Sequence, residues 1–247
     1  MKKKFGLIGR AVSHSYSKAY FDEKFFREKL RDYHYELYQL ADISGIKTLL
    51  SGDPEICGLN VTIPYKEQVL EFLDEIDAEA ARIGAVNVIQ IKDGKLKGFN
   101  TDSAAFYESL QHWLPQLSDQ KALILGTGGS GKAVQEALTK LSIPYLNVSR
   151  DSKLAPLTYA MLKVTDDILD AHKLIINTTP LGMSPDTALF PDIPYEKLDS
   201  SHMVYDLIYN PARTQFLQKA GMRGCSIKNG LEMLHLQAEK SWQIWNS

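Results

Sequence analysis

Short apolar runs alternate with longer amphipathic stretches along the first hundred residues of the chain. The short runs are typical of buried strands, whereas the longer stretches repeat apolar residues at the spacing of one helix face. The pattern predicts helices at residues 17–30, 43–50 and 69–83 and strands at residues 5–9, 33–40, 57–63, 86–91 and 96–99. Asp93-Gly94 separates the last two strands, and this pair favours the tight turn of a β-hairpin.

A second alternation of strands and helices begins near residue 102. It predicts a helix at 103–114, a helix after 131, a last helix from Asn229-Gly230 onward, and strands at 121–125, 145–148, 174–177 and 203–207. Strands that alternate with helices are typical of an α/β fold with a mainly parallel sheet. We therefore predict an α/β protein with a domain boundary near residue 102.

Composition narrows the class of protein. The chain has 28 Lys and Arg against 30 Asp and Glu, a formal net charge of −2, so no overall positive field is present to hold nucleic acid or an anionic membrane. No apolar stretch reaches membrane-spanning length, and the run after Lys2 to Lys4 is too short for a signal peptide. We expect a soluble, cytoplasmic protein.

Cys57 and Cys225 belong to no CxxC pair or Cys/His cluster, so neither a disulfide scaffold nor a bound metal is expected.

A glycine-rich turn, residues 126–131, joins a predicted strand directly to a predicted helix. This context is typical of the GxGxxG loop that binds dinucleotides. Gly126 permits the tight turn, while Gly128 and Gly129 let the backbone approach a pyrophosphate. Gly131 allows the helix to pack closely, and the N–H groups at the helix start receive the phosphate charge. The alternative is a glycine-rich turn that binds no ligand.

The segment Ser149-Arg150-Asp151 follows the next strand, where the adenosine ribose of a dinucleotide lies. An acidic residue here normally meets the 2′-hydroxyl of NAD, and an Arg accommodates the 2′-phosphate of NADP. Both residue types are present, so the residues alone leave the choice of cofactor open. Either charge could also be an ordinary surface charge in a turn.

Four further polar segments lie next to predicted strands or helix starts. Ligand groups collect at such places in an open α/β sheet. The segments are His14 to Ser17, Asn60 to Lys66, Ala85 to Asn87, and Asn100 to Asp102.

Together with the glycine loop, these segments resemble the motifs of the shikimate dehydrogenase family, in the family's order and over nearly the whole chain. The family carries Ser-x-Ser, Asn-Val-Thr-x-Pro-x-Lys, Gly-Ala-Val-Asn and Asn-Thr-Asp. After its glycine loop it carries Asn-x-Thr-Pro-x-Gly-Met, Tyr-x-Pro-x-x-Thr and Gly-Leu-x-Met-Leu followed by Gln. The matching residues here are Ser15 with Ser17, 60–66, 84–87, 100–102, 177–183, 209–214 and 230–237. No single motif is decisive, but their ordered occurrence is highly specific.

The chain departs from the family pattern at three places. Ala11 and Lys18 stand where the family usually has Pro, and Ser149 stands where it often has Asn. Lys18 is expected to add a positive charge near the site for the substrate carboxylate.

The resemblance implies two domains. Residues 1–101, completed by C-terminal helices at about 226–247, would form a mixed-sheet, substrate-binding catalytic domain. Residues 102–225 would form a Rossmann-like, doubly wound NADP-binding domain. The implied activity is the reversible reduction of 3-dehydroshikimate to shikimate with NADPH, in the shikimate pathway to chorismate and aromatic amino acids. The alternatives are a quinate/shikimate dehydrogenase that uses NAD or a related polyol acid, and a catalytically silent nucleotide-binding homologue. A monomer or homodimer is expected.

The resemblance also assigns roles to residues. Lys66 and Asp102 match the catalytic pair, in which an ammonium and a carboxylate hold, polarise and protonate the ketone oxygen. The pair titrates as a unit, so the residue that transfers the proton stays open. The residues that match substrate ligands are Ser15 and Ser17 for the carboxylate, and Asn60, Thr62, Asn87, Tyr209 and Gln237 for the ring hydroxyls. The residues that match cofactor ligands are Gly126, Gly128, Gly129, Ser130, Gly131, Ser149, Arg150, Asn177, Thr178 and Gly230.

Taken one by one, the same side chains have simpler explanations. Ser17 and Asp102 could be only the N-caps of the helices that follow them. Lys66 could be a surface lysine, and Gln237 an ordinary polar residue on a helix face.

Overall fold

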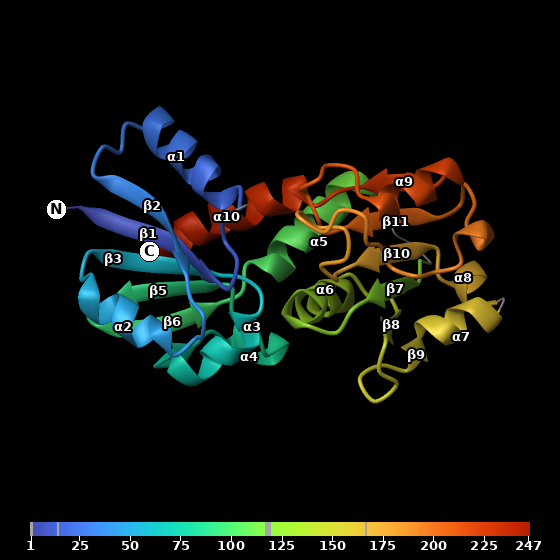
Figure 1. Ribbon diagram of the computed structural model, residues 1–247, viewed down its shortest axis with the longest axis horizontal. Coiled ribbons are helices and arrows are strands. Elements are labelled where there is room, and N and C mark those ends of the chain that lie inside the picture. The colour runs from blue at the N-terminus through green and yellow to red at the C-terminus, as the bar shows by residue number, and fades with distance from the viewer. Residues whose placement is uncertain (1, 14, 117–119, 166) are drawn as a thin grey trace. The chain divides into compact units, whose positions relative to one another are not determined.

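A computed structural model describes residues 2–13, 15–116, 120–165 and 167–247. The chain divides into two compact units. The terminal unit contains residues up to Thr101 together with Gln237–Ser247, so it is built from both chain ends. The central unit is Asp102–Leu236. Figure 1 labels most of the elements of both units.

The terminal unit has a mixed six-stranded sheet in the order β2-β1-β3-β5-β6-β4. β1 is parallel to β2 and β3, whereas β5 is antiparallel to β3 and β6. The strands are β1 (Lys3–Gly9), β2 (Tyr33–Gln39), β3 (Ile56–Val61), β4 (Glu75–Ile76), β5 (Val88–Lys92) and β6 (Lys95–Phe99). The helices are α1 (Ser17–Arg27), α2 (Gly45–Gly52), α3 (Tyr65–Gln68), η1 (Val69–Phe72), α4 (Ala78–Ile83) and the last part of α10 (Leu231–Trp245).

Aromatic packing binds the C-terminal helix to the terminal unit. The indole ring of Trp245 stacks on Phe5 with 4.8 Å between ring centroids, and its N–H donates to the carbonyl of Ile89 at 3.0 Å. A Cβ at Gly58 would lie 2.3 Å from this indole ring, so glycine is required where α10 crosses β3. The C-terminal residues are therefore part of the core of this unit.

The predicted hairpin is confirmed. β5 and β6 are antiparallel with Lys92 opposite Lys95, and Asp93 and Gly94 between them have φ angles of 53° and 75°. Two positive φ angles are required by the type I′ turn that suits a two-residue hairpin.

The single helix predicted for residues 69–83 is wrong. The chain instead forms η1, then the short strand β4, then α4. The Asp74 carboxylate accepts the Leu96 N–H at 2.7 Å, and Glu75 pairs with Lys97 of β6, which keeps this stretch extended. The Asp77 side chain accepts the N–H of Glu79 at 2.9 Å and so starts α4 as a new helix.

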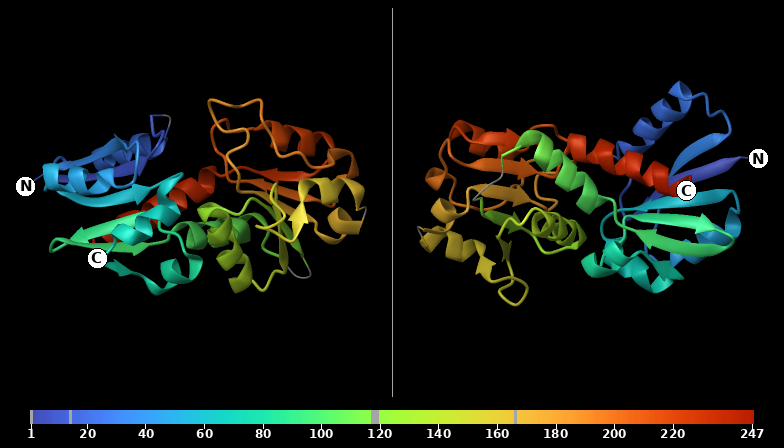
Figure 2. Two further views of the ribbon diagram at one scale, coloured as in Figure 1. Left: turned by 60° about the horizontal axis from the view of Figure 1, so that its bottom comes forward. Right: turned by 180° about the vertical axis from the view of Figure 1, so that it is seen from behind.

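The central unit has a six-stranded sheet in the order β12-β11-β10-β7-β8-β9, and every pairing in it is parallel. Helices cover both faces of this sheet (Figure 2). One buried cluster packs α5 and α6 against the sheet, and a second packs α7, α8 and α9 against it. The strands are β7 (Ala122–Leu125), β8 (Tyr145–Ser149), β9 (Leu157–Thr158), β10 (Leu174–Asn177), β11 (Met203–Asp206) and β12 (Ser226–Lys228). The helices are α5 (Asp102–Trp113), α6 (Gly129–Lys140), α7 (Tyr159–Val164), α8 (Asp167–Ala171), η2 (Tyr195–Lys197), α9 (Gln215–Met222) and the start of α10.

The strand order reverses direction at β7. The chain continues from β7 to β8 and β9 on one side, then returns to build β10, β11 and β12 on the other. Dinucleotides bind at the carboxyl ends of the strands at such a switch point.

The central unit extends further along the chain than the expected boundary near residue 226. β12 pairs with β11, and Met233 of α10 lies in the core of this unit. The division falls at Leu236 and Gln237, within α10.

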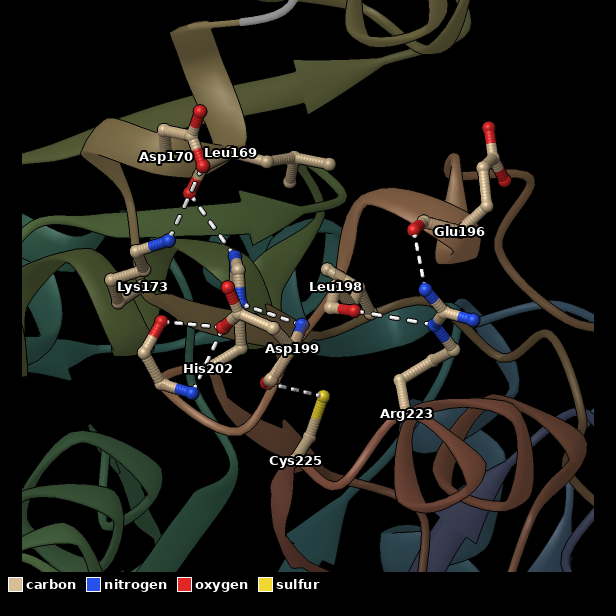
Figure 3. Close-up of polar contacts among 10 residues, drawn as sticks. Leu169, Asp170, Lys173, Glu196, Leu198, Asp199, His202, Arg223 and Cys225 are labelled. Carbon is tan, nitrogen blue, oxygen red and sulfur yellow. Dashed lines mark hydrogen bonds and ion pairs between the residues drawn. The ribbon is translucent and has the colours of Figure 1, made fainter.

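A polar cluster at the opposite, amino end of this sheet precedes β11 (Figure 3). His202 is fully buried, with Nδ1 2.9 Å from a carboxylate oxygen of Asp199 and Nε2 3.2 Å from the carbonyl oxygen of Leu169. The hydroxyl and N–H groups of Ser201 donate to the Asp199 carboxylate and, with His202, hold its pKa well below the usual range. These contacts connect the end of α8 to the start of β11.

Candidate active site

Four strand termini lie at one end of the sheet of the terminal unit. β1 and β3 are parallel, with Ile8 opposite Val61, so both strands finish at this end. β5 is antiparallel to β3 and to β6, so β5 starts and β6 finishes at the same end. The predicted residues in these strands, or in the segments that join them to the next or preceding element, are Ser15, Ser17, Asn60, Thr62, Lys66 and Asn87.

Asn60 lies at the centre of a buried hydrogen-bond network. Its Oδ1 accepts the Tyr35 hydroxyl at 2.8 Å, and its Nδ2 donates to Ser241 Oγ at 3.0 Å and to the Asn87 carbonyl at 3.3 Å. All of these partners belong to the terminal unit. The contacts favour a role for Asn60 in holding Asn87, and they add Tyr35 and Ser241, which the sequence did not single out.

Asn87 fixes the chain directly before Asp102. Its Oδ1 accepts the backbone N–H of Thr101 at 2.7 Å, and its Nδ2 donates to Thr101 Oγ1 at 3.0 Å. The same Nδ2 lies 3.5 Å from Gln237 Oε1. Asn87 and Gln237, two predicted ligands 150 residues apart, are thereby brought together.

Ser15 and Ser17 form a pair at the start of α1. Their hydroxyl oxygens lie 3.2 Å apart, and the Ser17 N–H donates to Ser15 Oγ at 3.2 Å. The N-cap position of α1 is Tyr16 and Ser17 is the first helical residue, so the alternative of Ser17 as the N-cap is wrong. His14, from the same polar segment, lies outside the described residues.

The charge of Lys18 is partly offset. Its ammonium donates to the Tyr35 carbonyl at 2.5 Å and lies 3.5 Å from carboxylate oxygens of both Asp22 and Glu36. The extra positive charge expected near the carboxylate site is therefore accompanied by two negative ones.

The two predicted catalytic residues lie on helices. Lys66 is the second residue of α3 and is half-buried, and its carbonyl accepts the Val86 N–H at 2.8 Å. Asp102 is buried and is the first residue of α5, so it is not the N-cap of that helix. A carboxylate in the first turn of a helix is stabilised by the helix dipole.

The glycine loop of the central unit has the geometry of a phosphate cradle. Gly126 has a φ of +118°, and a Cβ there would lie 2.6 Å from Thr178 Oγ1. A Cβ at Gly131 would lie 3.0 Å from the Gly126 carbonyl, whereas the space around Gly128 is open to 4 Å. Gly128 is the N-cap of α6 and supplies no side-chain cap. The first N–H groups of α6 are therefore suited to an anion.

The segment after β10 is tied to the glycine loop. Both the N–H and the hydroxyl of Thr178 donate to the carbonyl of Leu125, at 3.0 and 2.9 Å. The buried Asn177 accepts the N–H and the hydroxyl of Thr179 at 3.0 and 2.7 Å. Two predicted cofactor residues are thereby held beside the cradle.

At the end of β8 the two competing charges are arranged differently. The Asp151 carboxylate accepts the N–H of Lys153 at 2.9 Å, and its own N–H donates to Ser149 Oγ at 3.1 Å. Arg150 and Asp151 are both exposed, but the Asp151 carboxylate is engaged within its own turn. The role of Arg150 at the 2′ substituent of the ribose stays a prediction.

The segment after β11 contains Tyr209, which is half-buried. Gly230, another predicted cofactor residue, donates its N–H to the Ile208 carbonyl at 3.1 Å. A Cβ at Gly230 would lie 2.0 Å from the carbonyl oxygen of Leu207, so only glycine fits.

Sequence reasoning missed Asp206, a fully buried carboxylate at the end of β11. It accepts hydrogen bonds from Asn177, Ile208 and Thr214. The only local signal was an acidic residue closing an apolar strand just before the Tyr209 motif.

Asp206→Asn should remove a pH dependence of stability. Burial raises the pKa of Asp206 from 3.8 to about 6, so between these values the folded protein holds a proton that the unfolded chain has lost. The free energy of unfolding therefore falls as pH rises through this window, by up to roughly 3 kcal/mol from this group. Urea denaturation at a pH of about 4 and of about 7 should show the wild type losing stability relative to the variant. An equal difference at both pH values would contradict the raised pKa.

The comparisons with known proteins cover both units. The model of the shikimate dehydrogenase substrate-binding domain matches residues 7–89. A shikimate dehydrogenase (NADP(+)) of Methanococcus maripaludis is 37% identical over 256 residues, which cover 98% of this chain and 91% of the relative. The chain belongs to the shikimate dehydrogenase family.

Solved structures of the family confirm the predicted two-domain α/β fold. The crystal structure of a Thermus thermophilus shikimate 5-dehydrogenase in complex with NADP(H) and shikimate matches with a TM-score of 0.84 at 30% identity, covering 98% of this chain and 93% of that one. A quinate dehydrogenase from Corynebacterium glutamicum in complex with NAD matches with a TM-score of 0.84 at 28% identity, covering 99% of this chain and 93% of that one.

The residues of the central unit fit the dinucleotide that shikimate dehydrogenases use. The positive φ of Gly126, the open space at Gly128 and the uncapped start of α6 together leave room for a pyrophosphate against backbone N–H groups. Among the described residues, no group of three or more His, Cys, Asp and Glu side chains could hold a metal ion. No helix in the described ranges is both long and apolar enough to cross a membrane.

Proposed function

We propose that this protein catalyses the reversible reduction of 3-dehydroshikimate to shikimate with NADPH, a step toward chorismate and the aromatic amino acids. The observation that carries the proposal is the similarity over nearly the whole chain to shikimate dehydrogenases (NADP(+)). The complete Lys66 and Asp102 pair and the phosphate cradle at 126–131 support it. Binding alone would require neither member of the pair.

Reduction of the ketone needs one proton and one hydride. The hydride comes from NADPH when that cofactor is bound. The Lys66 ammonium donates a hydrogen bond to the ketone oxygen and polarises it, and the Asp102 carboxylate stabilises the ammonium. As the oxygen gains negative charge it takes a proton from this pair and becomes the hydroxyl of shikimate. In the oxidative direction the pair accepts that proton.

The other polar groups of the terminal unit bind and orient the substrate. Ser15 and Ser17, beside the N-terminus of α1, are suited to a carboxylate because hydroxyl donors and the helix dipole both favour negative charge. We propose that the ring hydroxyls are bound by Thr62, Asn87, Gln237 and Tyr209. A site built to bond hydroxyls strongly rejects analogues that lack them.

The competing functions can be separated by one matrix of assays. Purified protein is given shikimate or quinate with NADP+ or NAD+, and reduction of the cofactor is followed by absorbance. We expect the highest kcat/KM for shikimate with NADP+. A higher value for quinate or NAD+ would favour the alternative that the quinate dehydrogenase similarity represents. No turnover in any combination, with NADP+ bound, would favour a silent nucleotide-binding homologue.

The cytoplasmic location and the monomeric or homodimeric state expected from the sequence stay proposals.

Ser15→Ala and Ser17→Ala should each weaken substrate binding. Removing a hydrogen bond to a charged carboxylate should raise the KM for shikimate by the equivalent of roughly 0.5–3 kcal/mol. The KM for NADP+ should hardly change, because both serines lie in the terminal unit. Steady-state kinetics of the double variant test the assignment, and an unchanged KM for shikimate would rule it out.

Arg150→Ala should weaken the use of NADP+ but not that of NAD+. A guanidinium can fork onto a 2′-phosphate with charge-assisted hydrogen bonds, whereas NAD+ lacks that phosphate. The KM for NADP+ should rise and the KM for NAD+ should stay nearly constant. Lys153→Ala is the control, because it also removes one positive charge from a nearby exposed side chain. Should the wild type use NAD+ more efficiently than NADP+, Asp151 rather than Arg150 faces the ribose.

A further inference from the structure

Asp206 has no part in the reaction chemistry described above, yet it is the acceptor for three separate groups. Its Oδ1 accepts from Asn177 Nδ2 at 3.0 Å and from the Ile208 N–H at 3.1 Å. Its Oδ2 accepts from Thr214 Oγ1 at 2.5 Å. No part of Asp206 is exposed to solvent.

One donor, Asn177, lies at the base of one loop, and the other two, Ile208 and Thr214, lie in a second loop. We call residues 178–184, which follow Asn177, the β10 loop, and residues 207–214 the β11 loop. The loops also contact each other, since the Ser184 N–H donates to the Asn210 carbonyl at 3.1 Å. A Cβ at Gly182 would lie 3.5 Å from Thr214 Cβ. Asp206 therefore connects the base of the β10 loop to both ends of the β11 loop.

The position of the two loops identifies the half of the dinucleotide that they face. The glycine loop follows β7, and the segment suited to the adenosine ribose follows β8. β10 and β11 lie on the other side of the switch point. Because a dinucleotide spans this crevice, the β10 and β11 loops lie on the nicotinamide side. Asn177, Thr178 and Tyr209 of these segments are proposed ligands of cofactor or substrate.

A buried carboxylate at the end of a core strand is unfavourable, because the charged group loses its hydration. Replacing buried charged groups by apolar side chains is often neutral or stabilising. Here, however, two carboxylate oxygens satisfy three donors that would otherwise be buried without partners, which is unfavourable for each donor. The gain is a defined geometry for the two loops.

We propose that Asp206 is a positioning residue, which holds the β10 and β11 loops in the arrangement that binds the nicotinamide half of NADP. The inference rests on the proposed function for the identity of the cofactor. Asp206 acts through Asn177, Ile208 and Thr214 and touches neither substrate nor the reacting atoms.

The test measures NADP+ affinity by calorimetry and amide hydrogen exchange in the protein without cofactor. Asp206→Ala should weaken NADP+ binding about tenfold or more, because donors left without an acceptor release the loops. Exchange of amides in both loops should become faster. The KM for shikimate should change far less than the NADP+ dissociation constant. Asp206→Asn, which keeps an acceptor for Asn177 and Ile208, should lose less affinity than Asp206→Ala.

Asp199→Ala is the matched control, because this carboxylate precedes the start of β11, whereas Asp206 is at the end of the same strand. It should lower the melting temperature without changing NADP+ affinity. Equal loss of affinity in the two Ala variants, or wild-type affinity in Asp206→Ala, would overturn the proposal. If Asp206→Ala does not fold, Thr214→Val and Thr214→Ser decide: only the Val variant should weaken NADP+ binding, and equal affinities overturn the inference.

The same measurements separate this inference from the proposed function. A wild-type protein that binds NADP+ but does not oxidise shikimate contradicts the proposed function, and the variants still decide the role of Asp206. A wild-type protein that binds no NADP+ contradicts both.

Discussion

Lys66→Ala is expected to fold normally and to lose roughly two to four orders of magnitude in kcat, the usual contribution of a positioned proton donor. The fold should survive because two contacts that hold α3 do not use the Lys66 side chain. The Val86 N–H donates to the Lys66 carbonyl, and the Tyr65 hydroxyl donates to the Leu40 carbonyl. The measurement is steady-state kcat together with the melting temperature.

Lys95→Ala is the matched control for this change. Lys95 lies in the same unit, its side chain is 71% exposed, and its ion-pair contact of 3.9 Å with Glu75 is long. It should keep wild-type kcat. Near-wild-type turnover in a folded Lys66→Ala variant would remove Lys66 from the mechanism.

Asp102→Asn should cause a loss of kcat similar in size to that of Lys66→Ala. The substitution keeps the shape of a buried side chain at the start of α5. It removes the negative charge that, in the proposed mechanism, stabilises the Lys66 ammonium. Because residues that act as a unit give strongly non-additive losses, the double variant should be about as impaired as the worse single variant.

Thermal denaturation of the Asp102→Asn variant separates chemistry from folding. Asp102 lies in the first helical turn, where an Asn remains acceptable but loses the favourable charge. A modest fall in melting temperature with a large fall in kcat fits the proposed role. Losses in the double variant that equal the product of the single losses would show that the two residues do not act as a pair.

The parts of the fold that the sequence predicted correctly are those with a local sequence pattern. Asp93-Gly94 marks its hairpin by backbone preference alone, and the glycine loop marks the junction of β7 and α6. The stretch at 69–83 failed because a tertiary contact outweighed helical periodicity. Pairing of Glu75 with Lys97 and the hydrogen bond from Leu96 to Asp74 are invisible to a local pattern.

The residues of the candidate site also fall into two groups, those that local motifs predicted and those that only the fold reveals. Motifs predicted the candidate ligand-binding side chains, because those residues occur in short ordered segments. They could not locate the residues that hold them. Ser241 lies 181 residues from its partner Asn60, and Asp206 lies 29 residues from Asn177. Such partners are chosen by the packed fold, so the structure is needed to find them.

The most direct test of the proposed activity is the reaction in the biosynthetic direction. Purified protein is mixed with 3-dehydroshikimate and NADPH, the loss of NADPH absorbance is followed, and the product is identified by mass spectrometry. We predict that NADPH is consumed and that shikimate forms in equal amount, with the Lys66→Ala protein as the inactive reference. NADPH consumption no faster than in that reference, or consumption without shikimate, would contradict the assignment of this chain as a shikimate dehydrogenase.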